Sequence, residues 1–207
     1  MKLYLSSYKV GEKSQKLFEM FGNNKNVAVI ANAMDFIVDE NERHISVQKE
    51  LDALKQIGLE GEEVDLRDFF GKSENLATRL SNFGGVWVRG GNVFILRRAY
   101  TKSGMDNLLK SQKGNNELVY GGYSAGVCVL SPNLKGLELV DDPNKVPMGY
   151  EHEFNMEGVG LIPYAFAPHY HSPHPESEAV NGLVNFYERE GIKYKAISDG
   201  EVIITVT

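Results

Sequence analysis

Short, continuous apolar runs alternate along the chain with longer segments in which apolar positions recur at helical spacing. The run NVAVIA, for example, is typical of a strand that is buried on both faces. The short runs predict strands at 2–6, 26–31, 62–66, 85–89 and 118–121. The longer segments predict helices at 13–21, 43–57, 74–82, from 93 to about 100, immediately after Ser124, and at 176–190.

Strands that alternate with helices predict βαβ units, in which parallel strands are joined by right-handed crossovers. Residues 131–159 break this rhythm, because they are rich in proline, glycine, asparagine and acidic residues that favour loops and short strands. Two apolar stretches at 195–198 and 201–205 flank Asp199-Gly200, which predicts a two-residue β-hairpin. We therefore expect one α/β domain over residues 1–207, a three-layer sandwich with a mostly parallel central sheet.

Composition narrows the class of protein. Apolar residues make up 42% of the chain and charged residues 24%, which allows a full hydrophobic core. The net charge of −6 argues against a nucleic-acid binder that relies on a basic surface. Cys128 is the sole cysteine, so no internal disulfide can form, and this suits a reducing compartment. No stretch approaches ~18 apolar residues and the first residues do not resemble a signal peptide, so we expect a soluble cytoplasmic protein without a membrane partner.

The segment GYSAGV places Ser124 in a Gly-x-Ser-x-Gly pattern between an apolar strand and a helix. This is the pattern of a nucleophile elbow, in which the serine adopts a strained backbone and neighbouring glycines relieve the crowding. The turn lifts the hydroxyl above the sheet edge, and the backbone N–H of Ala125 can then contribute to an oxyanion hole. The alternative is a glycine-rich turn without chemistry, because such short patterns also arise by chance.

A nucleophilic serine needs a base within hydrogen-bond reach, usually a histidine that is oriented by a carboxylate. Three of the five histidines, His169, His171 and His174, cluster between prolines, whereas the other two are expected on the surface. Pro168 favours an extended or turned chain that could present a base at the carboxyl edge of the sheet. A zinc site on this cluster is a less favoured alternative, since no Cys, Asp or Glu lies within it and only Glu176 is near.

Several downstream carboxylates could orient that base. Sequence order alone leaves open the candidates Asp141, Asp142, Glu151, Glu176 and Asp199. Asp199 stands out because it lies in a tight turn between two apolar strands, although Asp-Gly is also an ordinary hairpin turn.

A second glycine turn, Arg89-Gly90-Gly91-Asn92, ends one predicted strand and opens the next helix. Gly91 can bring a backbone N–H close to a reacting carbonyl and so complete an oxyanion hole. Asn92 can at the same time cap the helix. The turn does not match Gly-x-Gly-x-x-Gly, so no dinucleotide site is expected, and we expect no other cofactor and no metal.

Four short motifs follow one another over nearly the whole chain: a strand with GGN and a helix, GYSAGV, Pro-His before an aromatic residue, and a late acidic-Gly turn. Together they resemble the aspartyl dipeptidase (dipeptidase E) and cyanophycinase family of serine peptidases. The resemblance implies a fold like that of class I glutamine amidotransferases, with a serine in place of the nucleophilic cysteine. It implies Ser124 as nucleophile, His169 as general base and Asp199, where the dipeptidase has a glutamate, as the orienting carboxylate. Gly91 and Ala125 would supply the oxyanion-hole N–H groups.

The chain departs from the family pattern at positions that bear on the substrate. Arg89 stands where the dipeptidase has a third glycine. The dipeptidase also has an arginine just after the histidine loop that binds an aspartyl side chain of the substrate, whereas here Glu178 falls at about that position. Because a carboxylate would repel an acidic substrate, specificity for Asp-X dipeptides is left open, and Arg89 is a candidate replacement cation. Asn92 and His171 are further candidate substrate-binding residues.

These features predict a cytoplasmic serine peptidase that hydrolyses a small peptide or amide and exists as a monomer or homodimer. The alternative from a different class is a catalytically inactive relative that binds a peptide or small molecule as a regulatory module. A glutaminase that uses Cys128 is disfavoured, because Cys128 lies about one helical turn beyond the elbow and is expected in the core.

Overall fold

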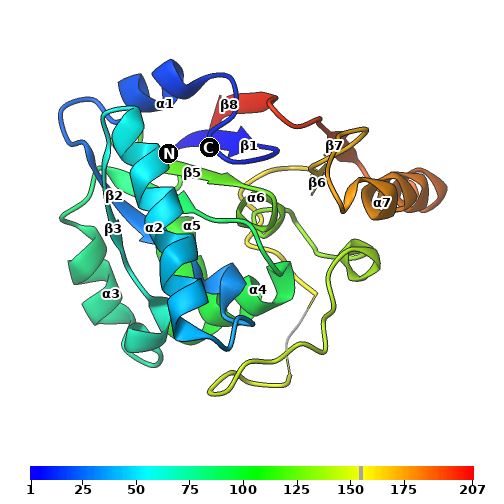
Figure 1. The fold of residues 1–207 in the computed structure, drawn as a ribbon, viewed down its shortest axis with the longest axis horizontal. Coiled ribbons are helices and arrows are strands. Elements are labelled where there is room, and N and C mark those ends of the chain that lie inside the picture. The colour runs from blue at the N-terminus through cyan, green and yellow to red at the C-terminus, as the bar shows by residue number, and fades with distance from the viewer. Residues whose placement is uncertain (154–155) are drawn as a thin grey trace.

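The computed structural model describes residues 1–153 and 156–207, which form an α/β fold around a central sheet (Figure 1). The strands are β1 Lys2–Ser6, β2 Asn26–Ile30, β3 Glu60–Glu63, β4 Gly85–Val88, β5 Val119–Tyr123, β6 Ala165–Ala167, β7 Tyr194–Ala196 and β8 Val202–Val206. The α-helices are α1 Ser14–Met20, α2 Glu40–Gln56, α3 Ser73–Leu80, α4 Val93–Ser103, α5 Met105–Ser111, α6 Ala125–Cys128 and α7 Ser177–Arg189. Short 3₁₀ turns occur at Asn32–Met34, Leu66–Phe69 and Leu137–Leu139.

In the described part of the chain the central sheet has six strands, in the order β3-β2-β4-β5-β1-β8. Five of them run parallel, and β8 pairs antiparallel with β1 at one edge. The carboxyl ends of the parallel strands therefore meet at one edge of the sheet, which is where α/β proteins build their sites. Val88 of β4 is paired with Gly122 of β5, so the turns that follow these two strands lie next to each other.

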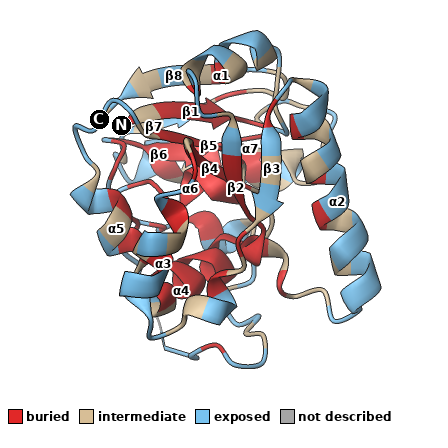
Figure 2. Cartoon of the chain, turned by 90° about the vertical axis from the view of Figure 1, so that its left-hand side faces the viewer, coloured by how far each residue is buried: buried red, intermediate tan, exposed pale blue. Residues whose placement is uncertain are grey.

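Alternating side chains divide the core into two layers, one on each face of the sheet. Val27 and Val29 of β2 join an apolar cluster with side chains from α1 and α2. Ala28 and Ile30 of the same strand face the other way and join a cluster to which α3, α4 and α5 contribute. Figure 2 shows the buried central strands between α2 on one side and these helices on the other, which is the predicted layered arrangement.

The predicted elements match the observed ones closely, with four local differences. The strand predicted at 62–66 ends at Glu63, because Asp65 caps the 3₁₀ turn that begins at Leu66 by accepting from the N–H of Arg67. The apolar helix after Ser124 is one turn long. Helix α5 and strand β6 were not predicted. Within the described chain, no helix combines the length and the apolar character that crossing a membrane requires.

The predicted C-terminal hairpin is wrong. Both strands exist, but β7 pairs in parallel with β6 in a separate two-stranded sheet, whereas β8 pairs with β1 in the central sheet. An Asp-Gly turn permits a change of chain direction, but the partner of each strand depends on which sheet edges lie within reach. This arrangement has a functional consequence, because Asp199 lies in the connection between the two sheets.

Candidate active site

Ser124 lies at the turn from β5 into α6 with backbone angles of φ 49° and ψ −122°, a conformation that is strained for an L-residue. The two glycines of the elbow are required by close packing against β4. A Cβ on Gly126 would lie 2.3 Å from the carbonyl oxygen of Val88, and one on Gly122 would lie 2.8 Å from the same atom. The Gly-x-Ser-x-Gly pattern therefore allows the turn to press against its neighbouring strand while it holds Ser124 at the edge of the sheet.

His169 is buried in the loop between β6 and α7 and is bonded to Asp199, with 2.6 Å between Nδ1 and Oδ1. A carboxylate can only accept, so Nδ1 carries the proton in this bond. Ser7, directly after β1, donates from Oγ to Oδ1 of Asp199 at 2.8 Å and accepts from the backbone N–H of His169 at 2.8 Å. Oγ of Ser172 accepts from the backbone N–H of Asp199 at 2.8 Å. Neither serine lies in a motif, so neither was predicted from the sequence.

Ser124 and His169 line the same cavity of about 390 Å³ at the carboxyl edge of the sheet. Because Nδ1 of His169 is engaged by Asp199, Nε2 is the ring nitrogen that remains for proton transfer. Glu176 also lines this cavity, and its Oε2 lies 3.9 Å from Nε2. Ser124, His169 and Glu176 thus line one concave site, and Asp199 contacts His169 without being part of that lining.

His174 stacks on His169, with ring centroids 3.7 Å apart and ring planes inclined by 7°. Burial lowers the pKa of His169, and the nearby charge of His174 lowers this pKa further, although the bond to Asp199 opposes both effects. Burial dominates, because the ring is almost fully removed from water. The neutral, proton-accepting form of His169 is therefore favoured near neutral pH.

The stacked rings bear on the zinc alternative. Among the described residues, His169, His174 and Glu176 can place three ligand atoms within 4.8 Å of one another, and His171 is not part of this group. The nitrogen lone pairs of two parallel, stacked rings lie in separate planes and do not converge on one point. A metal would therefore require the stack to open, which disfavours tetrahedral coordination in this arrangement.

The second glycine turn packs directly against the elbow. A Cβ on Gly90 would lie 3.0 Å from Cβ of Ser124, and one on Gly91 would lie 2.5 Å from the carbonyl oxygen of Ala33 in the loop after β2. Gly91 has a φ of 145° and lines the catalytic cavity, while Ala125 follows Ser124 as the first residue of α6. The turn and the helix start thus bring both predicted oxyanion-hole residues close to Ser124.

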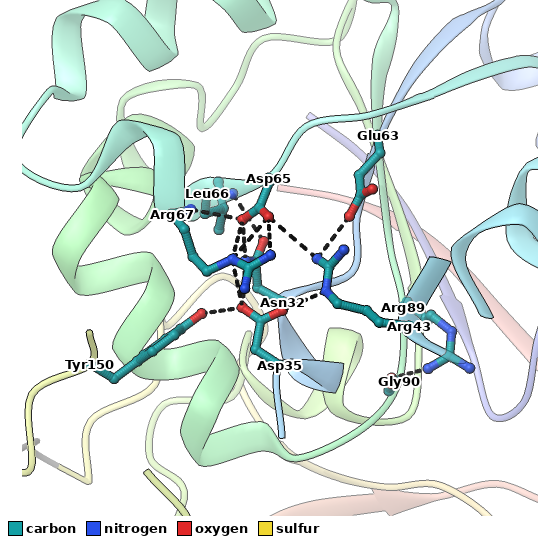
Figure 3. Close-up of polar contacts among 10 residues, drawn as sticks. All are labelled: Asn32, Asp35, Arg43, Glu63, Asp65, Leu66, Arg67, Arg89, Gly90 and Tyr150. Atoms are coloured by element: carbon teal, nitrogen blue, oxygen red, sulfur yellow. Dashed lines mark hydrogen bonds and ion pairs between the residues drawn. The ribbon is translucent and has the colours of Figure 1, made fainter. Parts of the chain in front are cut away.

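An ionic cluster supports the loop that Gly91 packs against (Figure 3). This Asp35 cluster comprises Asn32, Asp35, Arg43, Glu63, Asp65, Arg67 and Tyr150. Nε of Arg43 on α2 lies 3.0 Å from Oδ1 of the buried Asp35, and the hydroxyl of Tyr150 donates to the same carboxylate. These contacts hold the chain around Ala33 in place, because Asp35 lies only two residues further along.

Arg89 and Glu50 form an ion pair on the wall of the catalytic cavity. Nε of Arg89 lies 3.5 Å from Oε1 of Glu50, and its Nη1 donates to the carbonyl oxygen of Gly90 at 3.2 Å (Figure 3 shows the second contact). Glu50 is buried on α2, where it also accepts from the hydroxyl of Tyr123 at 2.6 Å and from Nε1 of Trp87 at 3.1 Å. Glu50 lies at helical spacing between the buried Val47 and Leu54, so its place on the inner face of α2 was the one sequence signal for it.

The remaining candidate substrate-binding residues lie differently. Asn92 is buried, and its side chain caps α4 and donates to the carbonyl oxygen of Asp142, so its polar atoms are used within the fold. His171 and Glu178 are exposed and lie outside the lining of the catalytic cavity. Arg89 is the one of the four that lines it, and Glu176 supplies the carboxylate there instead of Glu178.

A second, much smaller cavity of about 10 Å³ lies on the other side of Ser124. Asp141, Glu176 and Cys128 contribute to its lining. Burial raises the pKa of Asp141 to about 7, and the charge of Glu176 acts in the same direction. Cys128 is buried with a raised thiol pKa, as expected for a core residue.

A larger hollow, of about 710 Å³, lies at the opposite edge of the sheet. It is lined by the residues that begin β4 and β5, and Lys2 and Glu117 are its charged side chains. Its described lining contains neither histidine nor cysteine. Volume alone therefore does not single out the candidate site, whereas the convergence of titratable groups does.

The family model of peptidase family S51 matches residues 6–206 of this chain. The uncharacterized peptidase Lin0382 of Listeria innocua is 28% identical over 152 residues, which cover 73% of this chain and 68% of that protein. Peptidase E of Streptomyces coelicolor is 34% identical over 115 residues, which cover 55% of this chain and 43% of that protein. A crystal structure of a Listeria monocytogenes EGD-e protein assigned as a peptidase E has a TM-score of 0.75 at 24% identity, covers 100% of this chain and 98% of that one, and confirms the fold. The chain belongs to peptidase family S51, and it is a serine-type peptidase.

Proposed function

We propose that this peptidase hydrolyses a small peptide or amide through a triad of Ser124, His169 and Asp199. The observation that carries the proposal is the 2.6 Å bond between Nδ1 of His169 and Asp199, on a histidine that shares its cavity with the strained elbow serine. The bond fixes the tautomer, so Nε2 is free to accept a proton. A histidine held in this way, beside a serine on a nucleophile elbow, is the arrangement that acyl transfer needs.

In the first step Oγ of Ser124 attacks the carbonyl carbon of the substrate while its proton moves to Nε2 of His169. The new Oγ–C bond gives a tetrahedral intermediate whose negative charge lies on the former carbonyl oxygen. Collapse of this intermediate breaks the C–N bond, and the departing amine takes the proton from Nε2. Water then repeats the sequence on the acyl-enzyme, with His169 as base, and releases the acid. Asp199 stabilises the imidazolium that forms in each half of the reaction.

The developing oxyanion is stabilised by the N–H groups of Gly91 and Ala125. Each such donor contributes about 10²–10³-fold to the rate in enzymes of this kind. The close packing of Gly91 on Ala33 supports this role, because a side chain at position 91 would collide with Ala33 and displace the turn. The Asp35 cluster supports the same geometry, because it holds the chain around Ala33 in place.

The walls of the cavity favour a substrate that carries a carboxylate. Three cations, Lys9, Lys49 and Arg89, line it against two carboxylates, Glu50 and Glu176, and Glu50 is buried and bonded to neighbouring side chains. Arg89 can offer its guanidinium to a carboxylate, and every small peptide has such a group at its C-terminus. Arg89 is therefore proposed as the substrate-binding cation.

Active-site labelling tests the proposal. A fluorophosphonate probe is expected to label the wild-type protein and not Ser124→Ala, and His169→Ala is expected to slow labelling strongly because the base is lost. Ser46→Ala is a matched control, since Ser46 is another serine on the wall of the same cavity. Labelling of Ser124→Ala at the wild-type rate would overturn the assignment, as would peptide hydrolysis that persists in this variant.

A further inference from the structure

A second hollow, of about 410 Å³, continues from the catalytic cavity. Met34, Ser46 and Lys49 line both spaces, so the two hollows share a wall and adjoin along α2, and together they are called the groove. The far end of the groove is lined by Ile37 and Ile45, together with polar residues from the start of α2. The groove thus extends from Ser124 to a place that the proposed chemistry does not use.

The length of the groove exceeds that of a dipeptide. Its wall along α2 runs from Ala53 in the catalytic cavity to Asn41 in the distal hollow. At a helical rise of ~1.5 Å per residue this stretch is roughly 18 Å long. An extended peptide advances ~3.3 Å per residue, so the groove matches about five residues. A dipeptide would fill less than half of it.

The distal hollow is suited to an apolar side chain. Met34 and Ile37 are half-buried, and Ile45 is 55% exposed on α2, where it has no apolar covering among the described residues. The carboxylates at this end, Asp39 and Glu42, disfavour an acidic occupant. Asp39 is moreover engaged as the cap of α2, where its side chain accepts from two backbone N–H groups.

We propose that this hollow is a subsite for an apolar side chain of an extended oligopeptide, two or more residues from the cleaved bond. For the cleavage itself the inference rests on the proposed function of Ser124. The substrate class that follows is a peptide of about five residues with one apolar anchor. The cationic wall formed by Lys9, Lys49 and Arg89 would lie along its middle.

Peptides of two and five residues test the subsite, with leucine or serine placed in turn at every position on both sides of the cleaved bond. At one distal position, leucine is expected to raise kcat/KM about tenfold over serine, because an apolar group in a hydrophobic pocket contributes at least that factor. Ile45→Ser and Ile37→Ser are expected to reduce this ratio to near one. Val206→Ser is the matched control: Val206 is 65% exposed on β8, at the other end of the sheet, and its replacement should leave the ratio unchanged.

Binding to the Ser124→Ala variant makes the test independent of turnover. Fluorescence anisotropy with a labelled pentapeptide should show tighter binding for the leucine than for the serine form, and Ile45→Ser in that background should abolish the difference. Equal binding of both forms would overturn the subsite and leave the proposed function intact if dipeptides are still cleaved through Ser124. If Ile45→Ser changes the molecular mass measured by light scattering, and no leucine preference is found, then the apolar surface binds a second copy of the chain instead.

Discussion

His169 and Asp199 are brought together by the small sheet formed by β6 and β7. Ala167 and Ala196 are paired at the ends of these parallel strands, and the two functional candidates follow them by two and three residues. The resulting distance between Nδ1 and Oδ1 is 2.6 Å. The contact thus depends on strand pairing between segments that are 30 residues apart, and not on the local Asp-Gly turn.

Replacing Asp199 by asparagine should lower kcat by about 10³–10⁴-fold with a small change in KM. The amide can donate to Nδ1 and so favour the tautomer with the proton on Nε2, which cannot accept a proton from Ser124. Steady-state kinetics on a cleaved peptide measure the effect, and circular dichroism checks the fold. A loss of less than tenfold in a folded variant would show that Asp199 does not orient the base.

The pH dependence should reflect the lowered pKa of His169. The base works in its neutral form, so kcat/KM should stay constant as the pH falls through 6.5 and decline only below it. His174→Phe keeps a stacked ring and removes a charge that lowers the pKa of His169, so the acidic midpoint should move upward. The pH profiles of both proteins give this comparison. An acidic midpoint above 6.5 in the wild type would contradict the lowered pKa of His169.

Glu50→Gln should destabilise the fold at the wall of the cavity and change the fluorescence emission of Trp87, the sole tryptophan. The substitution removes the charge that pairs with Arg89 and disturbs the acceptor of Trp87 Nε1, so we expect a destabilisation of about 1–3 kcal/mol. Denaturant unfolding followed by Trp87 fluorescence measures it. Asp52→Asn is the control, because Asp52 is exposed on the same helix and accepts only from the exposed Gln48 in the described contacts. Equal stability of the two variants would contradict a structural role for Glu50.

Asp141→Asn should stabilise the fold more at pH 8 than at pH 5. The pKa of Asp141 is raised from 3.8 to about 7 in the folded chain, so the folded state binds the proton more tightly than the unfolded state. The Asp141 carboxyl therefore leaves the free energy of unfolding unchanged below pH 4. It lowers this free energy increasingly as the pH rises to 7, and by a constant amount above pH 7. Asparagine lacks this effect and can still accept from the N–H of Val93, as Asp141 does at 2.8 Å. Urea unfolding at the two pH values measures the difference, and a pH-independent effect would contradict the raised pKa.

Much of this architecture could be predicted from the sequence, because it depends on local patterns. Continuous apolar runs mark strands that are buried on both faces, and the glycines around Ser124 mark a turn that only small residues permit. The order of strands and helices then implies a parallel sheet whose carboxyl edge carries Ser124 and Gly91. The resemblance to a peptidase family pointed to His169 over His171, and the comparison with peptidase family S51 confirms that family.

The tertiary structure alone decided which groups surround these residues. The partners of β7 and β8, the place of Ser7 beside Asp199 and the burial of Glu50 under Tyr123 all arise from contacts between distant segments. No local pattern encodes such contacts, because a strand signal does not specify its neighbour and helical spacing does not specify the partners of a buried glutamate. The sequence thus determined the elbow and its fold, whereas packing determined the histidine–carboxylate pair and the shape of the groove.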